Sequence, residues 1–288
     1  MISMNKIYSY IELARLNKPI GIYLLLWPAL LGLIIAGVEN SISIIDVFIV
    51  IIGSIIVRSC GCVINDISDY KIDKLVTRTI GRPLATGALS TSEAWTFFVF
   101  LSFLSILILM FTNTLTIKIS LVAAFFIIIY PLTKRFFPAP QFFLGITFGS
   151  SVLIGHSLVT DVFSPSIILL YIGVIAWIIS FDTYYALEDI KDDKKIGINS
   201  TAILWGDKAI KISRNLHLFF YFCIFLIAIL NKFSFYFLIS FLLMILIFFY
   251  QKKLIDKKDF LGAFKINNLI GMLTVTAFVF EIFIIKLW

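Results

Sequence analysis

The stretch that decides the fold is Gly61-Cys62-Val63-Ile64-Asn65-Asp66-Ile67-Ser68-Asp69-Tyr70-Lys71-Ile72-Asp73. An apolar run long enough to span a membrane ends here in one amide and three carboxylates. On a helix, Asp66, Asp69 and Asp73 share an arc of about 60°, and Asn65 lies beside them. Like charges this close repel one another unless a cation binds between them. Oxygen ligands suit hard cations, Mg²⁺ first, especially when a phosphate completes the coordination.

The alternative for this stretch is a solvated helix end with chance acids. We favour a functional interpretation, because ionisable groups at membrane depth are costly and generally functional.

The composition predicts a polytopic membrane protein. The chain has 288 residues, of which 60% are hydrophobic and 14% charged, against about 25% charged in soluble domains. Its net charge is +7, but it has no Arg-rich run or aromatic-basic motif, so we expect no nucleic-acid partner. Cys60, Cys62 and Cys223 lie in apolar segments and lack zinc-site spacing, which indicates small packing residues.

Hydropathy and charge predict an all-α membrane protein with about nine transmembrane helices. Residues 1–18 form an amphipathic lead that we expect along the membrane surface. We expect one integral membrane domain, 1–288, with two loosely repeated halves, about 1–135 and 136–288. The expected spans are 20–38, 44–64, 94–111, 115–132, 141–159, 167–187, 216–231, 233–250 and 267–286.

The basic residues predict the orientation. Most of the 24 Lys and Arg residues lie in the lead and in the loops after the second, fourth, sixth and eighth spans. By the positive-inside rule the N-terminus and both acidic stretches face the cytoplasm, and Trp288 lies on the far side. A bacterial inner membrane is the simplest location.

A second acidic stretch ends the sixth span. On a helix, Asp182, Asp189 and Asp193 fall within about 40° of one another. Residues 188–195 alone could be an ordinary charged loop, but Asp182 lies deeper, in an apolar run, where an Asp costs about 3 kcal/mol. Two acid-bearing helix ends on one membrane side can face each other across a cleft and hold two divalent ions that bridge substrate phosphates.

Basic and phenolic side chains near both stretches fit a phosphate ligand. For most of them, anchoring at the membrane surface is an equally good explanation, whereas for Arg78 and Arg82 we favour ligand binding. The candidates are Lys74, Arg78, Arg82, Tyr130, Lys134 and Lys195.

Arg58 lies inside the second span, on the same helix face as Asn65 and about 10 Å deeper. A buried guanidinium needs an anionic partner, which could be Asp182 or the carboxylate of a small bound acid. His156 and His217 have no evident partner, and we interpret them as structural.

A diphosphate site at the mouth of an apolar bundle predicts a substrate with a charged head and a long apolar tail, such as an isoprenyl diphosphate. The 30 Phe residues could line a dry pocket in which aromatic faces stabilise an allylic cation.

The motifs resemble the UbiA superfamily of intramembrane aromatic prenyltransferases, and within it the 4-hydroxybenzoate polyprenyltransferase branch. The resemblance covers almost the whole chain. It is carried by Asn65-Asp66-x-x-Asp69-x-x-x-Asp73, Arg78-x-x-x-Arg82-Pro83-Leu84, Tyr130-x-x-x-Lys134, Asp182-Thr-x-Tyr185-Ala-x-x-Asp189-x-x-Asp192-Asp193, and Lys195-Ile-Gly-x-x-Ser-Thr-Ala.

The resemblance implies helices around a central cavity, with the acidic motifs facing each other under cytoplasmic caps. It implies transfer of a polyprenyl chain from polyprenyl diphosphate to 4-hydroxybenzoate, ortho to the hydroxyl, in ubiquinone biosynthesis. We expect the protein to lie in the lipid bilayer and to have no obligate protein partner. The implied Mg²⁺ ligands are Asn65, Asp69, Asp189 and Asp193, with Asp66, Asp73 and Asp192 supporting. As catalytic residues we expect Arg58 to hold the benzoate carboxylate and Asp182 to orient or partly deprotonate the phenol.

Two alternatives remain at this point. Within the enzyme class, the acceptor could be another aromatic compound. A secondary transporter also has intramembrane acids and repeated halves, although its acids usually lie near the bilayer midplane rather than at one face.

Overall fold

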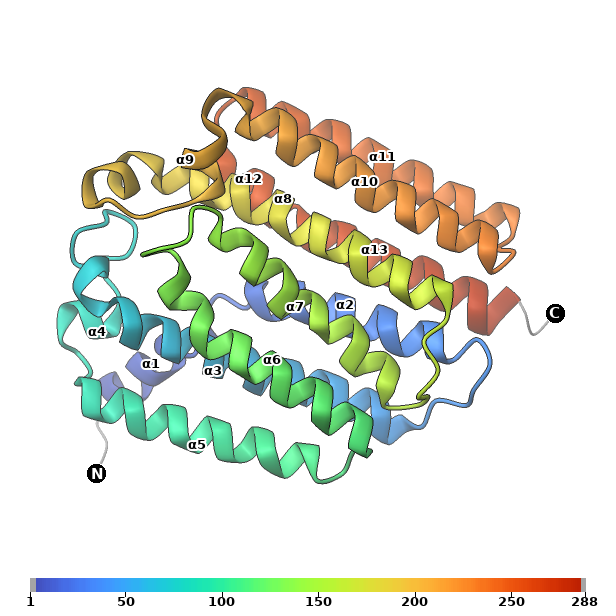
Figure 1. Ribbon diagram of the computed structural model, residues 1–288, viewed down its shortest axis with the longest axis horizontal. Coiled ribbons are helices and arrows are strands. Elements are labelled where there is room, and N and C mark those ends of the chain that lie inside the picture. Colours follow the sequence, from blue (N-terminus) through green and yellow to red (C-terminus); the bar gives the residue numbers. More distant parts are fainter. Residues whose placement is uncertain (1–3, 286–288) are drawn as a thin grey trace.

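The computed structural model describes residues 4–285, and these contain helices and no strands. Figure 1 labels the helices along the chain. Their bounds are α1 (Met4–Leu13), α2 (Ile20–Ala36), α3 (Ile44–Asp73), α4 (Pro83–Thr86), α5 (Thr91–Leu109), α6 (Thr114–Thr133), α7 (Pro140–Ser157), α8 (Pro165–Ile196), α9 (Thr201–Trp205), η1 (Gly206–Lys208), α10 (Ala209–Leu230), α11 (Phe235–Asp256), α12 (Phe260–Lys265), α13 (Asn267–Val279) and η2 (Phe280–Ile284).

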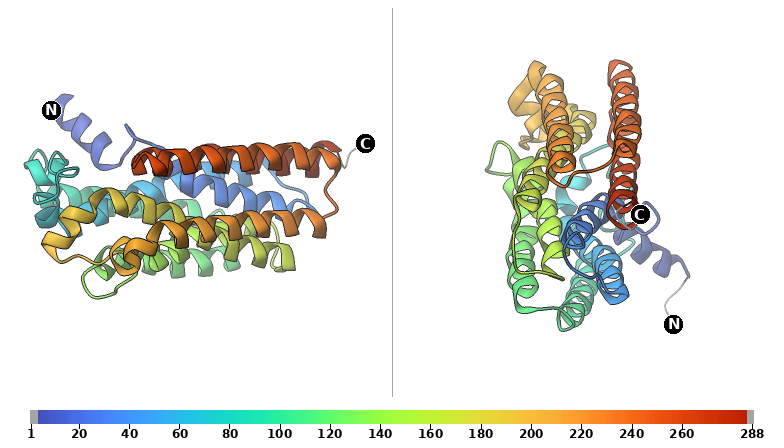
Figure 2. Two further views of the ribbon diagram at one scale, coloured as in Figure 1. Left: turned by 90° about the horizontal axis from the view of Figure 1, so that it is seen from above. Right: turned by 90° about the vertical axis from the view of Figure 1, so that its right-hand side faces the viewer.

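The long helices lie side by side along one common direction, with the connections gathered at the two ends of the bundle (Figures 1 and 2). Each of the nine expected spans coincides with one of α2, α3, α5, α6, α7, α8, α10, α11 and α13. By length and composition, seven helical segments of the described chain can cross a membrane, and α2 is a shorter apolar helix. The multi-pass all-α fold is therefore confirmed, whereas residues 286 and 288, for which the sequence makes predictions, lie outside the described residues.

Two helices extend well beyond the spans expected for them. The apolar spans end near residues 64 and 187, and the acidic residues beyond them continue the same helices, as expected: α3 has 30 residues and α8 has 32, or about 45 and 48 Å of helix. A bilayer core of about 30 Å cannot cover that length. The extra turns of both helices project from the same end of the bundle, near α4 and α9 (Figure 1), and these turns carry the acidic residues.

The N-terminal lead packs on the bundle through its C-terminal end. Leu13 and Ala14 are buried, Tyr10 meets the ring of Phe97 edge-on at 5.1 Å, and the hydroxyl of Ser59 donates to the carbonyl of Ala14 at 3.2 Å. The lead therefore contacts α3 and α5 directly, which a membrane-surface interpretation alone does not predict.

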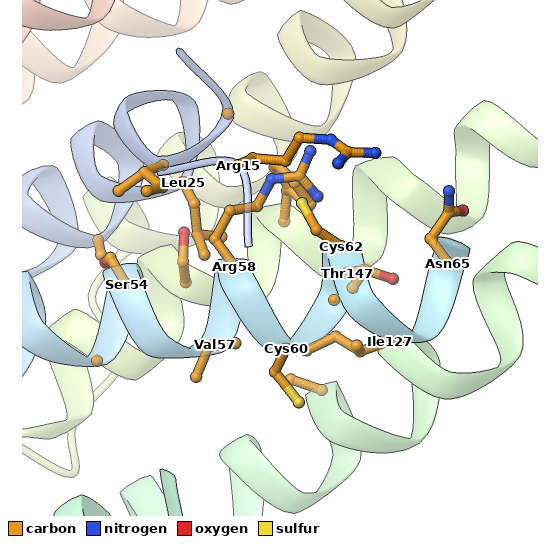
Figure 3. A pocket seen from close by; sticks show the side chains of 18 of the residues that line it. Arg15, Leu25, Ser54, Val57, Arg58, Cys60, Cys62, Asn65, Ile127 and Thr147 are labelled. Atoms are coloured by element: carbon orange, nitrogen blue, oxygen red, sulfur yellow. The ribbon is translucent and has the colours of Figure 1, made fainter. Parts of the chain in front are cut away.

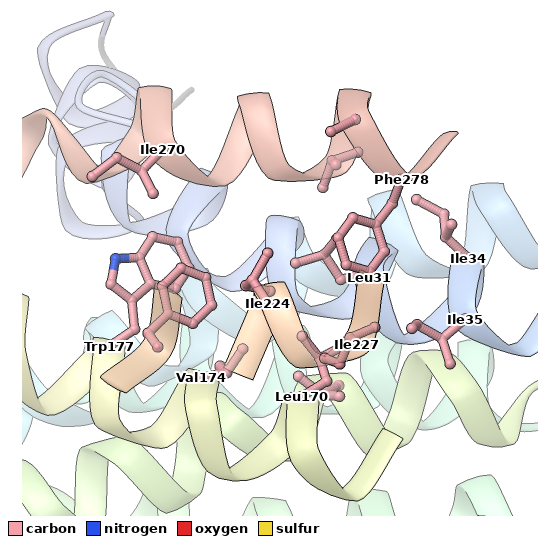
Figure 4. Packing of buried hydrophobic residues seen from close by; sticks show 14 of the residues in the cluster. Leu31, Ile34, Ile35, Leu170, Val174, Trp177, Ile224, Ile227, Ile270 and Phe278 are labelled. Atoms are coloured by element: carbon pink, nitrogen blue, oxygen red, sulfur yellow. The ribbon is translucent and has the colours of Figure 1, made fainter. Parts of the chain in front are cut away.

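Small residues and stacked rings hold the centre of the bundle together. A Cβ on Gly32 would lie 1.9 Å from the Val152 carbonyl oxygen, so α2 and α7 can approach this closely only without a side chain there. Trp177 of α8 stacks on Phe220 of α10 at 4.8 Å and donates to Asn267 at 2.7 Å. Figure 4 shows Trp177 within the apolar core, close to Ile224 and facing Ile270. This core packs around the part of α8 that precedes its acidic end.

Candidate active site

Two adjoining cavities define the site. The larger has a volume of about 1310 Å³ and is lined largely by apolar residues of α2, α3, α5, α6 and α7. The smaller, of about 150 Å³, is mainly polar and lies between the ends of α3 and α8. Both cavities share the wall residues Asn65, Arg78, Arg82, Tyr130, Asp182 and Tyr185. A ligand could therefore place a charged group in one cavity and an apolar tail in the other.

The structure brings the two acidic stretches together. Asp69 and Asp73 of α3, and Asp189 and Asp193 of α8, all line the smaller cavity. Arg78 connects the two sides, since its Nε lies 3.0 Å from both Asp189 oxygens and its Nη2 lies 2.5 Å from Oδ2. The Arg78 guanidinium also stacks 4.5 Å above the ring of Tyr185.

The acids on α3 are buried and paired. Asp66 accepts two 2.8 Å hydrogen bonds from Nη2 of Arg15 and one of 3.0 Å from Arg82. Arg82 also donates to both oxygens of Asp73, at 3.0 and 2.9 Å. Burial would lower the pKa of Arg82, but the Asp66 and Asp73 carboxylates outweigh it, so the pKa lies above its ordinary value.

Asp69 forms the contact with α6. Its carboxylate is 1% exposed and forms an ion pair with Lys134, while Arg135 lies 3.7 Å from Oδ1. The Asp69 Oδ1 atom is nevertheless buried without a hydrogen bond. A buried carboxylate oxygen in this condition is costly unless a further donor or cation reaches it.

These residues fit a hard divalent cation. Within residues 4–285, no three acidic, His or Cys side chains converge into a ready-made metal cluster. Arg78 and Lys134 instead hold two of the carboxylates. The smaller cavity is nonetheless lined by residues with side-chain oxygens, the ligand type that Mg²⁺ prefers, among them Asn65, Asp69, Asp73, Asp189 and Asp193, and the buried Asp69 Oδ1 has no hydrogen-bond partner.

Arg58 and Asp182 line the larger cavity below the polar end. The Arg58 guanidinium stacks 5.0 Å from the centre of Phe148, and its buried Nε has no hydrogen-bond partner. A Cβ on Gly21 would come within 2.6 Å of that nitrogen, so this glycine leaves the room that the guanidinium needs. Figure 3 shows the Arg58 and Arg15 side chains on the same side of α3.

Not every predicted residue reaches a cavity wall. Lys74 is exposed and lines neither cavity. Lys195 is 79% exposed and lies 4.0 Å from Asp192, outside both walls. Asp192 itself accepts a 3.1 Å hydrogen bond from the backbone N–H of Thr77 and so joins α8 to the loop after α3 rather than lining the site.

Sequence reasoning missed Arg15, Gln141 and Tyr185 as site residues. Gln141 lies beside Asp182, and its side-chain oxygen accepts from the Thr201 backbone N–H at 2.8 Å. The only sequence signal for Arg15 is its place in the basic lead, which the positive-inside rule already explains.

Comparisons with known proteins agree with this geometry. Residues 25–276 match the model of the UbiA prenyltransferase family. The chain is 40% identical to the 4-hydroxybenzoate octaprenyltransferase of Pasteurella multocida (strain Pm70), over 99% of both chains.

Two solved structures share the fold. A UbiA homologue from Aeropyrum pernix K1 is 25% identical, with a TM-score of 0.78 over 90% of this chain and 96% of the other. A UbiA homologue from Archaeoglobus fulgidus, solved with GPP and Mg²⁺, is 18% identical, with a TM-score of 0.72 over 94% of this chain and 99% of the other. Because the family model covers most of its length and the Pasteurella relative nearly all of it, the chain belongs to the UbiA prenyltransferase family.

Proposed function

We propose that this protein transfers a polyprenyl chain from polyprenyl diphosphate to the ring of 4-hydroxybenzoate, ortho to the hydroxyl, with Mg²⁺, as a step of ubiquinone biosynthesis. The observation that carries the proposal is the junction of a large apolar cavity with a small polar one, lined by acids from both α3 and α8. The name of the Pasteurella relative supports the choice of acceptor. We place the protein in a cell inner membrane with the acidic ends on the cytoplasmic side, as the basic loops indicate.

The smaller cavity is the proposed diphosphate site. Each half of the chain, 1–135 and 136–288, contributes one acidic helix end to it. Asn65, Asp69, Asp189 and Asp193 would hold Mg²⁺, with Asp66, Asp73 and Asp192 supporting them. Bound Mg²⁺ would neutralise charge on the departing diphosphate, and the archaeal relative solved with GPP and Mg²⁺ is consistent with this choice of metal.

Basic side chains of the same cavity bind the diphosphate oxygens in this proposal. Arg78, Arg82, Tyr130 and Lys134 line the cavity. Arg78 and Lys134 are paired with Asp189 and Asp69, so diphosphate entry exchanges these ion pairs for contacts to phosphate. Of the expected set, Lys74 and Lys195 lie away from the walls and would act only through the general positive charge of the loops.

The larger cavity takes the prenyl tail and the reacting carbon. The bond between the allylic carbon and the diphosphate oxygen breaks, the ring carbon of the acceptor forms a bond to the allylic carbon, and the ring proton leaves. Tyr130, Phe148 and Tyr185 line this cavity, where aromatic faces can stabilise positive charge and exclude water.

Arg58 and Asp182 position the acceptor. The unpartnered Nε of Arg58 suits a carboxylate, which a guanidinium binds with paired hydrogen bonds. Asp182 lies in the wall shared by both cavities, where it can accept a hydrogen bond from the phenol and so raise the electron density of the ring. The transporter alternative is disfavoured, because the carboxylates of both acidic stretches gather at one end of the bundle and not near its middle.

Product analysis tests the proposal. Purified protein with Mg²⁺ and a polyprenyl diphosphate is offered 4-hydroxybenzoate, its decarboxylated analogue phenol, and other hydroxylated aromatic acids, and the products are identified by mass spectrometry. We expect ortho-prenylated 4-hydroxybenzoate and no prenylated phenol. Preferential prenylation of a different acceptor would overturn the acceptor assignment, and no prenylated product with any acceptor would overturn the reaction.

A further inference from the structure

We propose that Arg15 is a positioning residue for the diphosphate site, which keeps Asp66 paired when Arg82 turns to the substrate. The inference rests on the proposed function, and it adds a residue that no motif assigns. It starts from a chain of alternating charges in the order Arg15, Asp66, Arg82 and Asp73, in which each inner group contacts both of its neighbours.

The carboxylates in this series of charged side chains are buried, so each of them needs a cationic partner. The Asp66 carboxylate is 1% exposed, so any loss of a cationic partner leaves a charge in a low-dielectric environment. The two arginines and the two aspartates together have a net charge of zero. Removal of one cation upsets that balance at a point that water barely reaches.

Arg82 is the residue of this charged series that can leave its carboxylate partners. It lines both cavities, whereas Arg15 lines only the larger one and Asp66 does not reach the smaller one. When a diphosphate enters the smaller cavity, the guanidinium of Arg82 can donate to phosphate oxygens instead of Asp66 and Asp73. Asp73 borders that cavity and can turn toward a cation there, but Asp66 would lose one of its two partners.

Arg15 is held in place beside Asp66. Its Nη2 contacts both Asp66 oxygens at 2.8 Å, and its Nη1 donates to the carbonyl of Glu12 at 2.7 Å. The backbone holds it in the left-handed region at φ 59°, which is uncommon for a residue other than glycine. A turn after α1 secures this conformation, because the N–H of Leu16 donates to the carbonyl of Ile11 at 3.0 Å. Arg15 therefore balances Asp66 whether or not Arg82 is engaged.

The first test compares two substitutions on the same N-terminal lead. In R15Q we expect the KM for polyprenyl diphosphate to rise about tenfold, while the KM for 4-hydroxybenzoate changes less than twofold. R15K keeps the charge without the planar fork and should lie between R15Q and the wild type. K6Q removes the ion pair between Lys6 and Glu93, away from the site, and should leave both KM values unchanged. A fall in kcat with no change in either KM, or an equal rise in both KM values, would contradict the proposal.

A double-mutant cycle separates positioning through Asp66 from direct binding of the diphosphate by Arg15. If Arg15 acts through Asp66, the KM for polyprenyl diphosphate is no higher in R15Q/D66N than in D66N alone. If the double variant instead raises this KM by the product of the two single effects, Arg15 binds the substrate directly, and the proposal is overturned. If R15Q does not yield folded protein, R15K and R15K/D66N complete the same cycle.

A binding measurement distinguishes failure of this inference from failure of the proposed function. A non-hydrolysable polyprenyl diphosphate analogue should raise the melting temperature of the wild type, and this shift should shrink in R15Q and persist in K6Q. If the wild type makes no prenylated benzoate but this pattern of shifts holds, the acceptor chemistry is wrong and the role of Arg15 stands. A full shift in R15Q would overturn the role of Arg15 whatever the product.

Discussion

The ends of α3 and α8 carry similar acids in different surroundings. On α3, the side chains of Asp66 and Asp69 are 1% exposed and that of Asp73 is 7% exposed, and Arg15, Arg82 and Lys134 hold them. On α8, Asp189 is 13% exposed and Asp192 is 23% exposed. The α3 end is therefore the more buried side, and each of its carboxylates has a cationic partner. The α8 end is the more open side, able to adjust as a ligand enters.

The loops that join the two ends reinforce this difference. Arg78 and Arg82 follow α3 but face different partners, since Arg82 pairs with α3 and Arg78 with Asp189 of α8. Burial opposes the charged form of Arg78, but its hydrogen bonds to Asp189 outweigh this, so the pKa of Arg78 lies above its ordinary value. Both guanidiniums stay charged throughout any usable assay range, and pH dependence of the activity must arise elsewhere.

The largest expected effect is on the α3 side. Asp69→Asn removes a proposed Mg²⁺ ligand and the partner of Lys134, so we expect kcat/KM to fall about 10³-fold. The matched variant Asp192→Asn, on the open side and outside the cavity walls, should lose only about tenfold. Steady-state kinetics at saturating Mg²⁺ measure both. Equal losses would show that the two ends do not differ as their burial suggests.

A second expected effect concerns stability rather than activity. Arg82→Gln leaves Asp66 and Asp73 buried with less compensation and should cost about 3 kcal/mol. Arg78→Gln breaks a pair whose side chains are 28% and 13% exposed, so solvent screens the loss and we expect less than about 1 kcal/mol. Thermal unfolding of both variants in one detergent compares the costs. A larger loss of stability in Arg78→Gln than in Arg82→Gln would contradict the difference between the more buried α3 end and the more open α8 end.

The sequence was sufficient where a feature depends on local periodicity. Hydropathy located a helix of the described residues at each expected span, and the helical repeat alone placed Asp66, Asp69 and Asp73 on one face. It was insufficient where partners lie far apart in the chain. Asp66 and Arg15 are 51 residues apart, and no local rule joins them, because the turn after α1 must first dock on α3.

The same limit applies to Lys74 and Lys195, which line neither cavity. Lys74 and Lys195 follow the acidic stretches directly in sequence, and proximity along the chain suggested a shared ligand. The extra turns of α3 and α8 point these side chains outward, because on a helix adjacent residues lie about 100° apart. The direction of each side chain around the helix end, and not its distance along the chain, therefore decides which basic residues face the cavity.

A third variant tests the acceptor end of the α3 face. Arg58→Ala should raise the KM for 4-hydroxybenzoate about tenfold or more and change the KM for polyprenyl diphosphate less than twofold, because only the carboxylate contact is lost. Arg58→Lys should recover part of the loss, since it restores the charge but not the fork. Competition kinetics with each substrate varied in turn measure the split. Equal effects on both KM values would remove Arg58 from the acceptor site.

The smallest expected effect probes the adjustable side by binding alone. Mg²⁺ with a non-hydrolysable polyprenyl diphosphate analogue at ten times its Kd should stabilise the protein by about 1.4 kcal/mol, more than either ligand alone. Asp193→Asn should reduce this shift strongly, because Asp193 lines the smaller cavity, whereas Asp192→Asn should keep most of it, because Asp192 lies outside the wall and accepts from the Thr77 backbone N–H. The two acids are neighbours in sequence and differ only in the face of α8 that they occupy. A shift that depends on Asp192 and not on Asp193 would therefore place the ligand against the other face of α8 and remove Asp193 from the proposed Mg²⁺ site.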